Sequence, residues 1–161
     1  MSMRPFEPST RLLWVFALGS VISTYILILI GGYVTTSDSG LGCGESWPLC
    51  SGAVLPALNN SAQIIEFSHR IFNFVVAFFI IGTAILVWTR YRREKNLVLF
   101  TTASFVGLFV QVFLGMVTVT SALNPIVGDA HLGLASAILA FLVVNVMMVR
   151  DVRPIPVALP R

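Results

Sequence analysis

The stretch LLWVFALGSVISTYILILIGGYV, residues 12–34, contains no charged side chain. As a helix with a rise of ~1.5 Å per residue it would span about 35 Å, more than the ~30 Å hydrocarbon core of a bilayer. A cleaved signal peptide is the alternative, but its apolar core would be only about 7–15 residues long, and no clear small-x-small cleavage site follows. We therefore expect residues 12–34 to form a membrane-spanning helix.

Composition and three further apolar stretches extend this interpretation to the whole chain. Of 161 residues, 57% are hydrophobic and 11% are charged, and the mean hydropathy is +0.90. Further helices are expected at about 64–89, 97–120 and 130–149, and turn residues with a proline in TSALNPIVGD indicate a loop before the last one. The predicted fold class is an all-α membrane protein, a single domain over residues 1–161 built as a four-transmembrane-helix bundle.

The placement of lysine and arginine predicts the orientation of this bundle. Basic residues lie before the first helix, in the RYRREK connection at 90–95 and after the last helix, but not at 35–63 or 121–129. By the positive-inside rule the termini and the 90–95 connection are cytoplasmic, and the other two loops lie outside a cell membrane. The terminal residues used are Arg4, Arg11, Arg150, Arg153 and Arg161. Because the positive charges are spread over three segments, the pI of 9.3 gives no support for nucleic-acid binding.

The only two cysteines, Cys43 and Cys50, lie in the predicted outer loop 35–63, within GLGCGESWPLCSG. Six residues separate them, enough to turn the chain, and an extracytoplasmic compartment permits disulfides. We interpret them as a disulfide that pins the loop, with two reduced thiols as the alternative. A zinc site is disfavoured because the loop has no histidine and no further cysteine to complete four ligands.

A faint internal similarity relates the two halves of the chain. GYVTTS at 32–37 has a counterpart in GMVTVTS at 115–121, and HRIFNFVVAF at 69–78 echoes HLGLASAILAF at 131–141. A possible helix-pair repeat makes the only two histidines, His69 and His131, equivalent. In an up-down-up-down bundle the second and fourth helices are parallel and diagonal, so two imidazoles at matching depth could hold one haem iron from both faces. An interfacial or hydrogen-bonded role is the alternative for either histidine alone.

The stretch IIEFSHR, residues 64–70, places Glu66 and Arg70 at the spacing of an i,i+4 ion pair, with His69 and Asn73 on the face of Glu66. Charge at the centre of a bilayer costs ~2.5–3.5 kcal/mol on insertion scales, which makes ionisable residues in such helices functional candidates. A purely structural ion pair is one interpretation. The other gives Arg70 to a haem propionate, which its guanidinium suits, and leaves Glu66 near the reacting edge of a porphyrin.

Several of these motifs together closely resemble the haem A synthase family, membrane enzymes that convert haem O to haem A. They are GGYVTTSDSGLGCGESWPLC at 31–50, SAQIIEFSHR at 61–70 and AHLG at 130–133. The resemblance covers nearly the whole chain, and each motif alone would be weak. It implies an eight-helix protein of two similar four-helix halves, each with a histidine pair, one pair serving a haem b cofactor and the other the substrate site.

By this resemblance His69 and His131 are axial ligands of haem iron, Cys43 and Cys50 form the outer-loop disulfide, and Glu66 is the catalytically important carboxylate. The implied reaction is oxidation of a haem O methyl group to the formyl group of haem A by successive two-electron steps. Because the chain has the length of one half, we expect self-association into a homodimer or larger homo-oligomer. Membrane lipid, a haem O synthase and cytochrome oxidase are the other implied partners.

Two other function classes remain open. A bis-histidine haem b electron-transfer cytochrome would use the same two ligands, but has no use for Glu66 beside one of them. A four-helix thiol-quinone oxidoreductase would also carry outer-loop cysteines, but it normally needs a second pair or a Cys-x-x-Cys motif to relay electrons.

Overall fold

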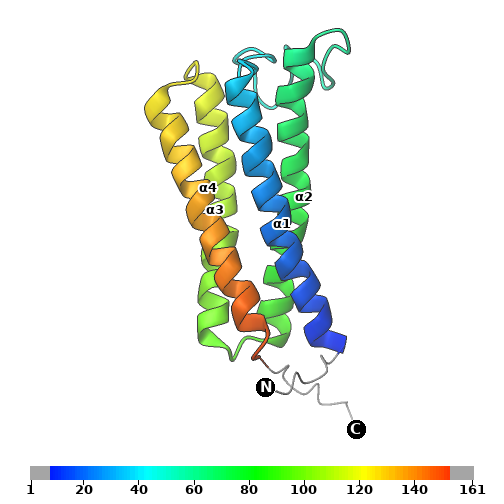
Figure 1. Ribbon diagram of the computed structural model, residues 1–161, viewed down its shortest axis with the longest axis vertical. Coiled ribbons are helices and arrows are strands. Elements are labelled where there is room, and N and C mark those ends of the chain that lie inside the picture. The colour runs from blue at the N-terminus through cyan, green and yellow to red at the C-terminus, as the bar shows by residue number, and fades with distance from the viewer. Residues whose placement is uncertain (1–7, 153–161) are drawn as a thin grey trace.

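Four long helices form an up-down-up-down bundle in a computed structural model that describes residues 8–152 (Figure 1). They are α1 (Pro8–Thr36), α2 (Ser61–Arg90), α3 (Lys95–Thr120) and α4 (Pro125–Val149). Each is long and apolar enough to cross a membrane, so the predicted all-α membrane bundle is confirmed and the chain is a multi-pass membrane protein. Three of the arginines used for the topology prediction lie outside the described residues, namely Arg4, Arg153 and Arg161.

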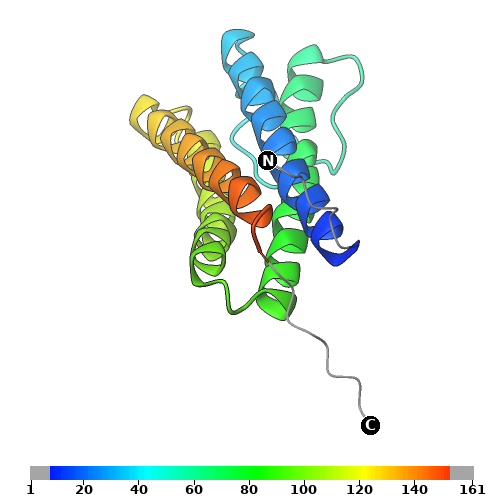
Figure 2. The same ribbon diagram turned by 60° about the horizontal axis from the view of Figure 1, so that its bottom comes forward.

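The helices are arranged so that α2 and α4 lie diagonally across the bundle. Helix α1 contacts α2 and α4, and α3 contacts the same two helices. The pairing of α1 with α2 and of α3 with α4 is visible in Figure 2. The α1–α2 and α3–α4 connections share one end of the bundle, and the α2–α3 connection lies at the other (Figure 1). Which end faces the cytoplasm stays a prediction from the charge distribution.

Helix α4 begins at Pro125, five residues before the expected start near 130. The side chain of Asn124 accepts a hydrogen bond from the Ile126 N–H at 3.0 Å and thereby caps the helix. Proline suits the first helical turn because its missing N–H would have no intrahelical partner there. The asparagine and proline that suggested a loop are therefore the start of a helix, and the connection shrinks to residues 121–124.

The turns that end α1 and α3 have matching hydrogen bonds. The Ser37 N–H donates to the Tyr33 carbonyl and the Ser121 N–H to the Val117 carbonyl, both at 2.9 Å. The next residues, Asp38 and Ala122, both adopt a φ of 51°. These are correspondences that a helix-pair repeat predicts, with 121 lying 84 positions after 37. In this register it is Gly31, and not Gly32, that corresponds to Gly115.

The core consists of two apolar clusters along the bundle axis. One includes Leu13, Val87, Leu97 and Val149, towards the end with the α2–α3 connection, and the other includes Val76, Ile80, Leu108, Ile138 and Leu142. A polar contact also joins α1 to α2, where the Ser20 and Thr83 hydroxyls lie 3.3 Å apart. Among the residues that the structure describes, Glu66 is the one buried side chain that carries a formal charge, which directs attention to the opposite end of the bundle.

Glycines bring α1 and α2 into close contact. A Cβ on Gly82 would lie 2.2 Å from the Phe16 ring, and one on Gly19 would lie 2.5 Å from the Phe79 ring. Each aromatic ring therefore packs over a glycine of the facing helix, and a side chain larger than glycine at that position would collide with the ring.

We expect Gly82→Ala to lower the thermal unfolding midpoint in detergent, because displacing the Phe16 ring costs about 1–3 kcal/mol. The matched control is Gly133→Ala in α4, where an added Cβ meets nothing within 4 Å and alanine raises helix propensity. Circular-dichroism melts of the two variants measure the difference. Equal midpoints would contradict the close α1–α2 packing.

Candidate functional site

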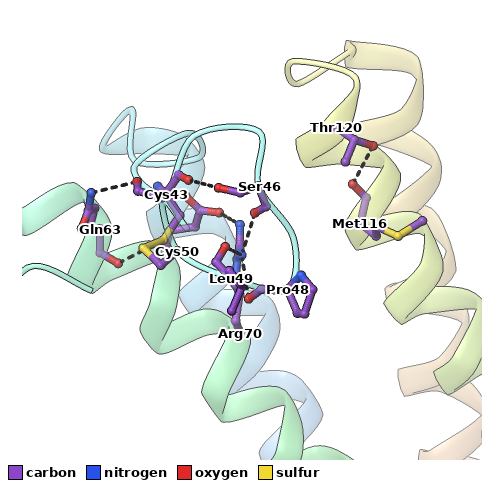
Figure 3. Close-up of polar contacts among 11 residues, drawn as sticks. Cys43, Ser46, Pro48, Leu49, Cys50, Gln63, Arg70, Met116 and Thr120 are labelled. Carbon is purple, nitrogen blue, oxygen red and sulfur yellow. Dashed lines mark hydrogen bonds and ion pairs between the residues drawn. A yellow bond between two sulfur atoms is a disulfide. The ribbon is translucent and has the colours of Figure 1, made fainter. Parts of the chain in front are cut away.

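A disulfide between Cys43 and Cys50 closes the loop that connects α1 to α2 (Figure 3). Both cysteines are buried, and the interpretation of the pair as a disulfide is confirmed. The Cys43 carbonyl accepts hydrogen bonds from the Ser51 N–H at 3.0 Å and from the Ser46 hydroxyl at 2.8 Å. We call residues 42–52 the cysteine loop, and its backbone is held by these internal contacts.

Glu66 joins the cysteine loop to α2. The residue is only 3% exposed. One carboxylate oxygen, Oε2, accepts a hydrogen bond from the Cys43 N–H at 2.8 Å, and the other, Oε1, pairs with the Arg70 guanidinium. The carboxylate thus bridges a backbone donor of the loop and a cation of its own helix.

Arg70 makes the complementary contacts to the loop. Its Nη1 donates to three main-chain carbonyls, those of Ser46 at 3.1 Å, Leu49 at 3.2 Å and Pro48 at 3.4 Å (Figure 3). The guanidinium therefore lies under the loop, where it is bound by carbonyl oxygens on one side and the Glu66 carboxylate on the other. The contact with a haem propionate remains a prediction for Arg70, as does the catalytic role of Glu66.

The other contacts between the cysteine loop and α2 lie at the first turn of the helix. A Cβ on Gly42 would lie 2.4 Å from the main-chain carbonyl of Ala62, so the two backbones touch. Gln63 accepts a hydrogen bond from the Ala57 N–H at 2.8 Å and donates to the Ser51 hydroxyl at 3.1 Å. Together these contacts fasten the loop along the start of α2.

The histidines extend from α2 and α4, and each lies against a glycine of a neighbouring helix. A Cβ on Gly31 of α1 would lie 3.0 Å from His69 Cε1, and one on Gly115 of α3 would lie 3.2 Å from His131 Cε1. Both residues lie within the first three turns of their helices. The structure therefore brings the two predicted ligands together, at the end of the bundle that carries the cysteine loop.

These residues fit a haem in their chemistry. The Nδ1 atom of each histidine is buried and has no hydrogen-bond partner among the described residues, whereas buried polar atoms are normally paired. The glycine beside each ring lets the imidazole lie directly against the backbone of the neighbouring helix. Two imidazoles on facing helices of a bundle are also a common way to hold haem iron.

Gln111 of α3 contacts His131 but was not among the predicted site residues. Its Nε2 donates to the His131 main-chain carbonyl at 2.9 Å and lies 3.3 Å from His131 Nε2. Its Oε1 is buried and unpaired within the part of the chain that the structure describes. The available signal was its isolation, because Gln111 is the only amide side chain between Asn96 and Asn124.

Sequence comparison is consistent with this geometry. A profile of the COX15-CtaA family, described as a cytochrome oxidase assembly protein, matches residues 14–160. The chain belongs to the COX15-CtaA family. The Heme A synthase of Bacillus pumilus (strain SAFR-032) is 37% identical over 123 residues, which cover 72% of this chain and 39% of the relative.

Two other relatives match longer stretches at lower identity. The Heme A synthase of Exiguobacterium sibiricum is 28% identical over 141 residues, 88% of this chain and 48% of the relative. The Heme A synthase of Lysinibacillus sphaericus is 29% identical over 142 residues, which cover 88% of this chain and 46% of the relative. The chain thus spans less than half the length of these curated relatives. Membership of the COX15-CtaA family confirms the resemblance, whereas the roles of individual residues still rest on their geometry.

We expect Gly42→Ala to loosen the cysteine loop from α2, because the added Cβ meets helix backbone that cannot move aside. Overpacking destabilises the docked loop by about 1–3 kcal/mol. Because the undocked loop exposes the disulfide, we expect its reduction to be about fivefold faster or more. Thiol alkylation and mass spectrometry after a timed exposure to a water-soluble phosphine measure this rate. Gly32→Ala is the control, since a Cβ there meets nothing within 4 Å. Equal rates for the two variants would contradict the docked loop.

Proposed function

We propose that this protein is a haem A synthase, a membrane oxidoreductase that converts the methyl group of haem O to the formyl group of haem A. The family match carries the proposal, since the relatives named above are Heme A synthases and the profile covers most of the chain. The facing histidines support it, because they supply the ligands that a haem requires. The activity is a proposal because the chain spans less than half of those relatives.

The proposed reaction is an oxidation of carbon. Converting –CH₃ to –CHO removes two hydrogen atoms and adds one oxygen atom. Written with water as the oxygen source, the conversion releases four protons and four electrons in two successive two-electron steps. An electron acceptor outside this chain therefore takes part in the reaction.

His69 and His131 would hold haem between α2 and α4, either haem b as cofactor or haem O as substrate. When bound, haem b supplies one-electron chemistry at its iron. Each histidine would contribute an imidazole nitrogen to the iron, and the parallel direction of α2 and α4 keeps both side chains at the same end of the bundle. Gly31 and Gly115 allow the two rings to pack against the backbones of α1 and α3.

Glu66 would act on the substrate from the loop side of this site. It lies three residues before His69 on α2, so both side chains share one face of the helix. The Cys43 N–H and Arg70 fix its orientation, and a fixed carboxylate can accept a proton or stabilise positive charge that develops nearby. A site on a packed helix suits this task, because reacting groups must be held within a fraction of an ångström.

We further propose that the protein works as a homo-oligomer in a cell membrane, with the cysteine loop outside. The described residues carry one histidine pair, and the resemblance implies two haem sites, so a second copy would supply the other pair. The positive-inside rule supports the orientation. A haem O synthase and cytochrome oxidase would be the partners that supply the substrate and use the product.

A bis-histidine electron-transfer cytochrome is the second candidate function. The observation that favours it is that Glu66 and Arg70 are both engaged with the cysteine loop, so the ion pair could serve structure alone. Such a cytochrome would bind haem b reversibly in both oxidation states and leave haem O unchanged.

Extraction and chromatography of haems test the proposed function. Membranes that contain this chain and a haem O synthase should yield haem A, whereas the His69→Ala and His131→Ala variants should yield none. In detergent, the converting activity should elute with an oligomer when the protein is separated by size. Haem b with unchanged haem O would favour the cytochrome, and conversion by a monomer would contradict the proposed self-association.

Glu66→Gln separates catalysis from structure at the same site. Glutamine can still accept the Cys43 N–H, and Arg70 keeps its three carbonyl acceptors, so we expect haem binding and resistance of the disulfide to reduction to persist. Loss of the proton acceptor should lower haem A formation by about 10²–10⁴-fold. Unchanged haem A formation would remove Glu66 from the chemistry, and a parallel loss of loop protection would assign it to structure alone.

A further inference from the structure

Gln111 places an amide N–H on a ring nitrogen of only one of the two histidines. Its Nε2 lies 2.9 Å from the His131 carbonyl oxygen, which can only accept a hydrogen bond. This contact identifies the atom as the amide nitrogen. The same nitrogen lies 3.3 Å from His131 Nε2, so this ring nitrogen is the acceptor and carries the lone pair of the imidazole.

The corresponding position beside His69 is apolar. Gln111 lies four residues before Gly115, the glycine that contacts His131, and Leu27 lies four residues before Gly31, the glycine that contacts His69. Leu27 packs with the apolar cluster around Val76 and Ile80 and has no hydrogen-bonding group. The two histidine positions are therefore matched in their glycines and differ four residues before each glycine, where α1 has Leu27 and α3 has Gln111.

We propose that Gln111 is a positioning residue that makes His131 the exchangeable haem ligand and leaves His69 as the permanent one. The inference rests on the proposed haem site. A lone pair of an imidazole can accept a hydrogen bond or bind a metal ion, but not both at once. Ligation through His131 Nε2 therefore competes with the Gln111 amide, whereas Leu27 offers no competing group.

The unpaired oxygen of Gln111 supports a side chain that changes partners. Its Oε1 is buried and has no hydrogen-bond partner among the described residues, and burial of an unsatisfied polar atom is destabilising. An amide held by one strong hydrogen bond to the His131 carbonyl can keep that contact while it releases or covers the ring nitrogen. A synthase needs such a device, because its substrate must enter and its product must leave the same site.

Haem transfer from the purified full-length protein tests this proposal. Wild-type protein, Gln111→Leu and Leu27→Gln are loaded with haem b in detergent, and transfer to excess apomyoglobin is followed by absorbance. Gln111→Leu should slow transfer by about 2- to 10-fold, the worth of one hydrogen bond, and keep a six-coordinate low-spin ferric spectrum. Leu27→Gln, the matched control, introduces a competitor beside His69 and should speed transfer.

Other outcomes overturn the proposal. Faster transfer or a high-spin spectrum in Gln111→Leu would show that the amide only holds His131 in place for ligation, and unchanged transfer would show that it has no effect on exchange. Because the assay uses haem b and no conversion of haem O, its result is independent of the synthase activity. A wild-type protein that exchanges haem b in this way but makes no haem A would refute the proposed function and leave the role of Gln111 intact.

Discussion

The end of the bundle that carries the cysteine loop depends on the buried carboxylate of Glu66. A carboxylate removed from water requires charged or hydrogen-bonding partners, because an uncompensated buried charge is strongly destabilising. Here the partners are the Cys43 N–H and the Arg70 guanidinium, one from the loop and one from α2. The carboxylate can be buried only while the loop is docked, and the loop is docked in large part because the carboxylate is there.

Arg70 supplies hydrogen-bond donors to the carbonyl groups of the loop. Irregular backbone has carbonyl groups that no helical hydrogen bond satisfies, and three of these in the cysteine loop accept hydrogen bonds from one guanidinium nitrogen. The negative charge of the ion pair therefore accepts a hydrogen bond from a loop N–H group, and its positive charge donates hydrogen bonds to loop carbonyls. The Cys43–Cys50 disulfide closes the loop so that these groups converge, and Gly42 lets its backbone lie against α2.

The sequence was sufficient for features that depend on local spacing or on solvent. Uncharged runs predicted four spans, and the i,i+4 spacing predicted the Glu66–Arg70 pair. It was insufficient where one pattern has two structural meanings: the asparagine and proline at 124–125 suit a turn, but they also cap and begin a helix. The contacts of Arg70 with carbonyls could not be predicted, because every residue has a carbonyl. The contact of Gln111 with His131 depends on how α3 is rotated against α4, which apolar periodicity alone does not determine.

The α1–α2 pair and the α3–α4 pair have matching turns and glycine contacts, but different side chains near their histidines. Gly31 and Gly115 contact the histidines in the same way, and the turns after α1 and α3 share their hydrogen bonds. Glu66 precedes His69 by three residues, but Gly128 takes that place before His131, and among the described residues only the ring of His131 has a hydrogen-bonding contact, with the Gln111 amide. The α2 side is thus held by a disulfide-closed loop and an ion pair, while on the α4 side the Gln111 amide contacts the ring and the main-chain carbonyl of His131. A protein that binds one haem for chemistry and then releases it benefits from this inequality, because a rigid ligand fixes the porphyrin and a weakly held one lets it go.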